Sequence, residues 1–561
     1  MTACQLALQS LDRRLSAFQR TASHYSELPI DLQNVWQRIF RDDPIPLSTE
    51  SDRSLAGRQI AATGRLPGRA VAPHIPLGAT GSSKLFTIFR DTDLIILLPI
   101  HCRHALEMLQ KLYSALPIPL QQACATAQGA RYYHWRYGGL FQQYSSTLKH
   151  TEFLPAEQLR ELQTAELDRL RRFVSLHVPH YRKHSPAAFT TKDQIRERPE
   201  DFIADTFPRR ALIPWHTSGT TGKPLTVYYS REAMQRMWAF VELYRNTAGV
   251  TKDDRRGQFT GKMIVPPRQS ASTKIFWRRD LANHALLLST VHLLPRNLQH
   301  YAAALERFRP VYLSGYPSSM YVLAEYYRQS GRPAPQLKAA LTSAETLLYY
   351  QRHTIAETFA TRVFDQYGQA EMQSFWYECE AGRMHAHPLA GVTEILRPDG
   401  TPTAPGEMGE VVLTGLVNYA MPLMRYRVGD TARFAAESCP CGRGMPVIEE
   451  IGGRLDDFVY TRERGFLGRL DPVLKGVRNI VESQVEQESL DVLRIRFVPA
   501  ARFTAEDLHM LETNLRARVG RSIHLEFECT DRIPRSANGK FRFVISRLDR
   551  NLPKSCASSR G

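Results

Sequence analysis

A loop rich in glycine and hydroxyl residues, and ending in a lysine, is the strongest chemical signal in the sequence. Residues 217–224 read TSGTTGKP. The two glycines let backbone N–H groups approach an anion closely, the hydroxyl side chains add donors, and Lys223 adds positive charge. Such a loop suits a polyphosphate such as ATP, although the same residue types also build ordinary turns. The candidate phosphate-binding residues are Ser218, Gly219, Thr220, Thr221, Gly222 and Lys223.

The context of this loop distinguishes it from a P-loop. The GxxxxGK[ST] spacing is absent, and the strand-like residues 225–229 follow where a P-loop requires a helix. TSGTTGKP instead resembles the signature loop of adenylate-forming enzymes, the superfamily of acyl-CoA synthetases, nonribosomal peptide adenylation domains and luciferases. The resemblance implies that a carboxylate is joined to the α-phosphate of ATP and that pyrophosphate is released.

A second motif matches the magnesium element of this family. Residues 367–371, YGQAE, resemble the family's YGxxE element, which implies that Tyr367 and Gly368 lie at the nucleotide and that Glu371 holds Mg²⁺. One carboxylate is sufficient, because Mg²⁺ takes its other ligands from phosphate oxygens and water. The alternative for Glu371 is a helix-capping acid.

Two further stretches resemble elements that hold the nucleoside. Residues 425–430, RYRVGD, resemble the RYRTGD element, in which Asp430 would accept hydrogen bonds from the ribose hydroxyls. Outside the family this string would indicate a turn with a surface ion pair. Residues 342–345 resemble the stretch whose backbone passes beside adenine, with an alanine where the family has glycine. The residues expected there are Ser343, Ala344 and Glu345.

A hinge between two domains is indicated by residues 451–457, IGGRLDD, which resemble the family's GRxDD element and make Arg454 the hinge residue. A second GRLD string at residues 468–471 leaves Asp471 as an alternative. With the first copy preferred, residues 458–467 are interpreted as an inserted hairpin.

The C-terminal region ends in a candidate catalytic lysine. Residues 533–540, IPRSANGK, resemble the lysine loop of the superfamily, which implies that Lys540 stabilises the attack of the carboxylate on the α-phosphate. A lysine on a turn is otherwise simply solvated. Residues 313–319, 438–443 and 538–542 together resemble the phenylacetate–CoA ligase branch, especially its capsule-biosynthesis CapK-type members and the adenylyltransferases of deazaflavin coenzymes. The resemblance covers residues 110–548.

Cysteines and histidines in two distant segments indicate a zinc site. Cys439 and Cys441, with Cys379 and either His385 or His387, would form a Cys₃His set that suits tetrahedral Zn²⁺. Four protein ligands leave no open position, so the role would be structural. The alternative is a group of buried free cysteines. His385 is the preferred imidazole.

The elements that must position these residues follow a repeating pattern. Residues 311–371 alternate strand, turn and helix, which predicts a parallel sheet flanked by helices. Ligands of such sheets bind beyond the carboxyl ends of the strands. The residues expected at that edge are Ser314, Glu345, Tyr367 and Glu371.

The fold class expected is α/β: a large N-terminal adenylation domain with parallel sheets flanked by helices, plus a small mobile α+β C-terminal domain. In the latter, residues 493–497 and 523–527 alternate as strands, and a helix follows Thr504. The boundaries expected are an N-terminal extension without assigned chemistry (1–109), the large adenylation domain (110–454), the lid domain (455–550) and a tail (551–561).

Composition restricts the class of protein. The chain has 561 residues, 43% hydrophobic residues and a net charge of +17, with its arginines scattered rather than clustered. This favours a diffuse field that attracts nucleotides and acidic substrates over nucleic-acid binding. The start of the chain is too polar for a signal peptide, and no run is long enough to span a bilayer. A cytoplasmic enzyme is expected, with a homodimer left open.

The function expected is an AMP-forming ligase, similar to phenylacetate–CoA ligase, that uses ATP and Mg²⁺. It would activate a small aryl or arylacetic acid and pass it to CoA or another thiol, with Lys540, Glu371 and Lys223 as catalytic residues. Phe259 and Tyr316 are candidates for the acyl pocket. The alternatives are an adenylyltransferase or acyl-ligase acting on a coenzyme or surface polysaccharide precursor, and a non-catalytic nucleotide-binding assembly protein.

Overall fold

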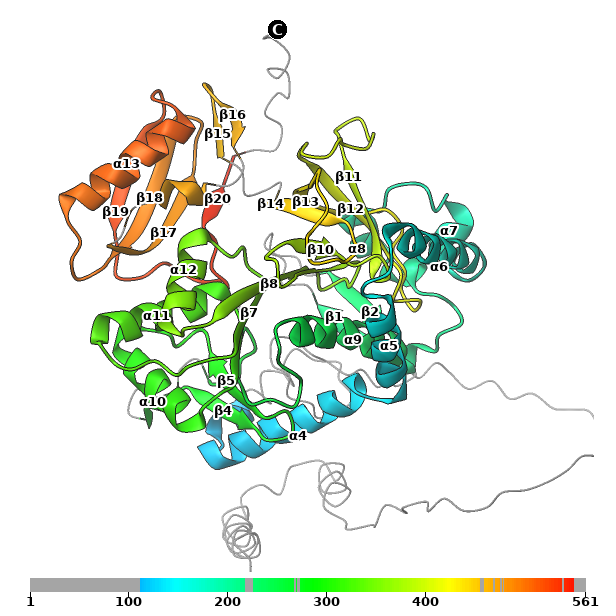
Figure 1. Cartoon of the computed structure of the whole chain (residues 1–561), viewed down its shortest axis with the longest axis horizontal. Coiled ribbons are helices and arrows are strands. Elements are labelled where there is room, and N and C mark those ends of the chain that lie inside the picture. Colours follow the sequence, from blue (N-terminus) through cyan, green and yellow to red (C-terminus); the bar gives the residue numbers. More distant parts are fainter. Residues whose placement is uncertain are drawn as a thin grey trace, which may run out of the picture. The chain divides into compact units, whose positions relative to one another are not determined.

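A twelve-stranded sheet is the centre of the larger domain (Figure 1). The computed structural model describes residues 111–216, 225–266, 269, 273–454, 459–467, 470–474, 477, 479–536 and 539–548. Within these residues the strand order is β11-β12-β13-β14-β10-β9-β8-β7-β6-β3-β5-β4. The strands are β3 (Arg256–Thr260), β4 (Trp277–Asp280), β5 (Ala285–Ser289), β6 (Tyr312–Gly315), β7 (Ala339–Ser343), β8 (Arg362–Gly368), β9 (Phe375–Glu378), β10 (Met384–Ala386), β11 (Gly391–Leu396), β12 (Gly409–Gly415), β13 (Tyr426–Phe434) and β14 (Val447–Arg454).

The sheet is parallel in one half and antiparallel in the other. Strands β8, β7, β6, β3 and β5 pair in parallel, as the repeating strand-helix pattern predicts. Strands β8 to β14 pair antiparallel, as does β4 with β5. The strand-turn-helix pattern of residues 311–371 predicts only the parallel half. The expected α/β class is confirmed, and the antiparallel strands extend the same sheet.

Helices cover both faces of the parallel half, because successive residues of each strand point to opposite sides. Tyr312 and Phe364 pack with the helix α9 residues Phe240 and Tyr244, whereas the neighbouring residue Leu313 packs with helices α10, α11 and α12. No described helix combines the length and apolar character that a membrane span requires. The helices of the larger domain are α4 (Ile118–Arg136), α5 (Gly139–Thr151), α6 (Ala156–His177), α7 (Pro179–Lys183), α8 (Lys192–Glu197), α9 (Arg231–Thr247), α10 (Leu298–Phe308), α11 (Pro317–Ser330) and α12 (Tyr349–Thr358).

Two short hairpins lie outside the main sheet. Strands β1 (Ile213–His216) and β2 (Thr226–Tyr229) pair antiparallel, so the strand expected after the phosphate loop is present. The loop itself, residues 217–224, lies outside the described residues, as do the N-terminal extension (1–109) and the tail (551–561). Strands β15 (Val459–Thr461) and β16 (Gly465–Leu467) also pair, which confirms the inserted hairpin.

The C-terminal region has its own four-stranded sheet, ordered β19-β18-β17-β20. Its elements are β17 (Ile480–Gln487), β18 (Val492–Pro499), helix α13 (Ala505–Val519), β19 (His524–Cys529) and β20 (Val544–Ser546). Thr504 precedes the helix, and its backbone N–H donates to Asp507 at 3.0 Å, as in a helix-capping motif. Leu511 and Leu515 pack against Ile495, so the predicted helical stripe forms the core of this domain.

The backbone after β7 adopts a conformation that normally requires glycine. Ala344 has a φ of 70°, in the left-handed region where a Cβ atom is unfavourable. The family resemblance places a glycine at this position, so this chain retains the turn without the residue that makes it easy. Strain is therefore stored directly beside Glu345.

We predict that Ala344→Gly raises the free energy of unfolding by up to about 1 kcal/mol, because glycine adopts the left-handed conformation without a steric cost. The matched control is Ala356→Gly in α12, which should lower it by about 1 kcal/mol, since glycine destabilises a helix. Denaturant unfolding of both variants measures the difference. A loss of stability in both would contradict the backbone argument.

Candidate active site

The carboxyl ends of β6, β7 and β8 meet at one edge of the sheet. Ser314 of β6 pairs with Leu341 of β7, and Ser343 of β7 pairs with Gln366 of β8, so the three strands end at a similar level. The turns that follow carry the residues expected at that edge. Segments far apart in the sequence are therefore adjacent, as parallel strands require.

Tyr367 and Asp430 form a pair at this edge. The Tyr367 hydroxyl donates a hydrogen bond to Asp430 Oδ2 at 2.6 Å, and the Tyr367 ring stacks on Trp376 with its centroid 4.2 Å away. Asp430 is 7% exposed. In the sheet register Asp430 of β13 pairs with Arg454, the last residue of β14. Three residues from three motifs thus lie together, with a carboxylate that can accept hydrogen bonds from ribose hydroxyls.

Glu371 lies in a buried place that suits a magnesium ligand. Glu371 is 5% exposed, and the Tyr426 hydroxyl donates a hydrogen bond to Glu371 Oε1 at 2.7 Å. That hydrogen bond neutralises no charge, and a buried carboxylate is stabilised by a cation. Tyr229 of β2 donates to the carbonyl of the preceding residue, Ala370, which ties the β1–β2 hairpin to the Glu371 segment. Tyr426 belongs to the RYRVGD motif at residues 425–430, and this motif is the signal in the sequence that could have placed Tyr426 at the site.

Lys540 ends a tight loop that contacts the larger domain. The Lys540 N–H donates to Ser536 Oγ at 3.0 Å, and the Ser536 N–H donates to the Lys540 carbonyl at 3.0 Å. Gly539 has a φ of 76°, and a Cβ atom there would collide with the side chain of Thr290. Lys540 Nζ lies 5.8 Å from the ring centroid of Tyr316, which follows β6. The predicted lysine thus lies beside the strand edge described above.

Glu345 makes a contact that its sequence context does not indicate. Its Oε1 accepts the N–H of Phe541 at 2.5 Å, and its Oε2 accepts the N–H of Ser318 at 3.3 Å. Burial raises the pKa of Glu345, while the Phe541 N–H and Arg535 act in the opposite direction. Phe259, a candidate for the acyl pocket, is 2% exposed and packs within the core.

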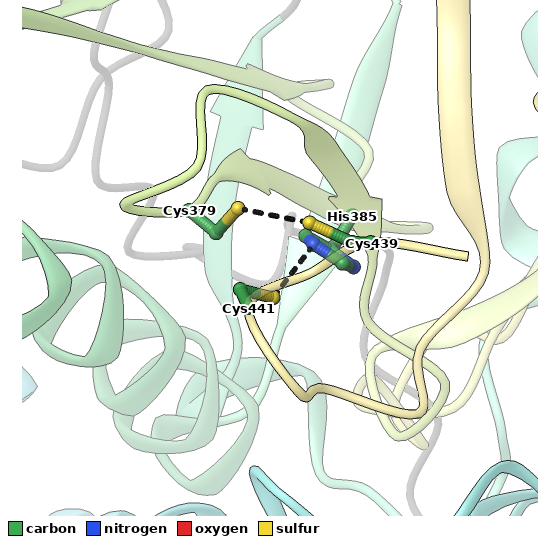
Figure 2. A group of neighbouring side chains, drawn as sticks. All are labelled: Cys379, His385, Cys439 and Cys441. Atoms are coloured by element: carbon green, nitrogen blue, oxygen red, sulfur yellow. Dashed lines mark hydrogen bonds between the residues drawn. The ribbon is translucent and has the colours of Figure 1, made fainter. Parts of the chain in front are cut away.

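Three cysteines and one histidine form a compact cluster. The candidate ligand atoms of Cys379, His385, Cys439 and Cys441 all lie within 4.8 Å of one another (Figure 2). Cys379 Sγ lies 3.6 Å from Cys439 Sγ, and Cys441 Sγ lies 3.4 Å from His385 Nε2. Sulfur ligands at about 2.3 Å from zinc are about 3.8 Å apart in a tetrahedron. The donor set and its spacing therefore fit Zn²⁺.

The surroundings of the cluster select His385 over His387. His385 Nδ1 lies 3.4 Å from the Met445 carbonyl, an arrangement that leaves Nε2 facing Cys441. Burial lowers the pKa of His385 to about 4, so its ring is neutral at pH 7. His387 is also buried, but it packs edge-on against Phe240 and is not part of the cluster.

An arginine holds the cysteine loop against two other segments. Arg443 forms ion pairs with Glu380 and Glu152, and its side chain is 2% exposed. A Cβ atom at Gly444 would collide with the Leu154 carbonyl, so the loop after the cysteines packs closely on the turn between α5 and α6. The cluster therefore joins the β9–β10 turn to the β13–β14 loop at a well-packed place.

Comparison with known proteins identifies relatives along most of the chain. Residues 459–547 match the family model described as CapK C-terminal domain. Protein CapK of Staphylococcus aureus is 29% identical over 371 residues, covering 64% of this chain and 79% of that protein. A phenylacetate-coenzyme A ligase of Thermus thermophilus is 26% identical over 447 residues, covering 70% of this chain and 98% of that protein.

A solved structure supports the same fold. The crystal structure of 2-hydroxyisobutyryl-CoA ligase in the postadenylation state has a TM-score of 0.57 and 20% identity, covering 72% of this chain and 92% of that chain. The chain is therefore a homologue of CapK and of phenylacetate-coenzyme A ligases, and it shares the fold of 2-hydroxyisobutyryl-CoA ligase; these relatives support an AMP-forming ligase.

Proposed function

We propose that the protein uses ATP to convert a carboxylic acid, aryl or arylacetic, to an acyl-adenylate, and passes the acyl group to a thiol such as coenzyme A. The observation that carries this proposal is the position of Lys540. It lies beside Tyr316 at the strand edge where Glu371 and the Tyr367–Asp430 pair are found. The phenylacetate-coenzyme A ligases among the relatives support the class of acid and acceptor.

Each residue has a role in the first step. A carboxylate oxygen attacks the α-phosphorus of ATP, and the bond to pyrophosphate breaks. Asp430 accepts hydrogen bonds from the ribose hydroxyls. The residues beside the adenine base are Ser343, Ala344, Tyr367 and Gly368. The ammonium group of Lys540 stabilises negative charge that is redistributed as the new bond forms. In the second step a thiol attacks the acyl carbonyl and AMP leaves.

Charge at the leaving phosphates needs further compensation. Lys223 and the donors of residues 218–222 supply it from the signature loop, which lies outside the described residues. Mg²⁺, when bound, would add Lewis-acid stabilisation of the phosphate oxygens, and the buried carboxylate of Glu371 fits its coordination preference.

A different acceptor is the second candidate. Since the chain is similar to CapK and to the CapK C-terminal domain as well as to the phenylacetate-coenzyme A ligases, we keep as the alternative an acyl-ligase that acts on a surface polysaccharide precursor, or an adenylyltransferase. The first step is shared, so the site described above serves either reaction. A non-catalytic assembly protein would not need both Lys223 and Lys540. A homodimer and a cytoplasmic location stay predictions.

We also propose that Cys379, His385, Cys439 and Cys441 hold a structural Zn²⁺ (Figure 2). The metal would connect the β9–β10 turn to the loop between β13 and β14. Since β13 carries Asp430 and β9 carries Trp376, the metal would stabilise the strands that support Tyr367 and Asp430, the pair proposed to hold the nucleoside and called the nucleoside pair below. It would take no part in the reaction, because its four ligands leave no open position.

We predict that Lys540→Ala lowers the rate of acid-dependent pyrophosphate release by on the order of a hundredfold or more, which in practice abolishes it, because a transition-state contact is lost. ATP binding should persist, and chemically supplied acyl-AMP should still be converted to thioester if CoA is the acceptor. The matched control is Arg532→Ala, which removes an exposed cation from the same segment. A Lys540 variant that forms acyl-AMP at the normal rate would show that the lysine loop is misassigned.

We predict that replacing Thr221 and Lys223 by alanine weakens ATP binding roughly 10- to 100-fold, the effect of losing hydrogen bonds to a charged group. Calorimetry with ATP measures the dissociation constant. Lys338→Ala, which removes an exposed lysine remote from the loop in sequence, is the control for net charge. Unchanged nucleotide affinity would remove the loop from the site.

We predict about one zinc per chain in protein purified without chelators. Cys439→Ser should lose the metal and lower the melting temperature, because two distant segments are no longer joined. Cys529→Ser replaces an exposed free cysteine and should change neither. Elemental analysis and thermal unfolding give the two readouts. Stable, metal-free protein would leave the free-cysteine interpretation.

A further inference from the structure

The carboxylate of Glu345 is one of the points where the larger domain contacts the lysine loop, residues 533–540. Its two oxygens accept N–H groups from segments on either side: Phe541, directly after Lys540, at 2.5 Å, and Ser318, near the start of α11, at 3.3 Å. The two partners are 196 and 27 residues away in the sequence. One side chain thus connects the C-terminal domain to the strand edge that carries the nucleoside pair.

The backbone before Glu345 determines where its side chain lies. Strand β7 ends at Ser343, and the left-handed conformation of Ala344 turns the chain immediately before the glutamate. Ser318 is the second residue of the fourteen-residue helix α11, where backbone N–H groups lack partners within the helix and favour an anion. The strained turn at Ala344 is thus matched by a contact that needs a carboxylate.

Apolar contacts next to Glu345 also position the lysine loop. Phe541 is 8% exposed and packs with Leu348, which precedes α12, and with Ile533. Arg535 pairs with Glu482 of the C-terminal sheet, and its guanidinium lies 4.8 Å from the Phe541 ring centroid. Gly539 packs on Thr290 without room for a side chain. In this set, Glu345 alone supplies a charge-assisted hydrogen bond from the larger domain to the residue next to Lys540.

We propose that Glu345 is a positioning residue that latches the lysine loop against the larger domain, and so favours acyl-adenylate formation over the thioester step. The proposal rests on the proposed function of Lys540. Glu345 acts through the backbone of Phe541, which sets where the preceding lysine lies. Releasing this hydrogen bond is part of any movement that withdraws Lys540 after the first step.

The latch can be tested without relying on activity alone. In Glu345→Ala the Phe541 amide loses its acceptor, so deuterium uptake by a peptide spanning residues 539–546 should rise in the full-length protein. The rate of acid-dependent pyrophosphate exchange should fall roughly tenfold or more, as expected for a lost hydrogen bond to a charged group. ATP affinity, and the conversion of supplied acyl-AMP to thioester, should be retained.

Two further variants separate positioning from general damage. Glu345→Gln keeps an acceptor for Phe541 but turns an amide donor toward the Ser318 N–H, so its effect should lie between those of the wild type and the alanine variant. Glu325→Gln alters another buried glutamate, which accepts hydrogen bonds from Arg328 and Gln329 on the same helix, α11. It should change neither deuterium uptake at 539–546 nor the balance of the two steps.

Unchanged deuterium uptake in Glu345→Ala would overturn the latch. Increased uptake with both half-reactions unchanged, or lowered by the same factor, would overturn the role of Glu345 in favouring acyl-adenylate formation. Failure of the proposed function has a different signature: the wild-type protein would then release no pyrophosphate with any acid, while the uptake difference between wild type and Glu345→Ala would still decide whether the loop is latched.

Discussion

The parallel register of β6, β7 and β8 is the constraint on which the rest of the site depends. It brings the turns after Gly315, Ser343 and Gly368 to one edge of the sheet, although these turns are separated by tens of residues. Both faces of the strands are buried by helices, so a slip of one residue would exchange the sides occupied by Tyr312 and Leu313. The apolar core therefore determines where Tyr367, Glu345 and Tyr316 lie.

The antiparallel half of the sheet adds what the parallel half lacks. Asp430 of β13 contacts Tyr367 of β8 although β9, β10 and β14 lie between these strands in the sheet order, and Trp376 of β9 stacks on the Tyr367 ring. The cysteine cluster lies where β10 pairs with β14, with the Arg443 ion pairs beside it. The Tyr367–Asp430 pair and the cluster thus share strands, so a metal that joined these segments would act on that pair through the sheet.

Charged groups at the contact with the C-terminal domain are buried but partnered. Glu345 accepts two backbone N–H groups, and Glu482 pairs with Arg535. Burying such groups costs free energy unless hydrogen bonds replace water, so these contacts give specificity to the contact rather than large stability.

The sequence by itself was enough to predict the resemblance to phenylacetate–CoA ligases and CapK, the parallel half of the fold, the C-terminal strand-helix-strand unit and the inserted hairpin, because these follow from local motifs and from the periods of apolar residues. It also named Cys379, Cys439 and Cys441. Tertiary structure decided between His385 and His387, since only His385 lies within β10 at its pairing with β14. It also revealed the contact of Glu345 with Phe541, which joins residues too far apart for any local pattern to indicate, because it arises from the packing of two separately folded sheets.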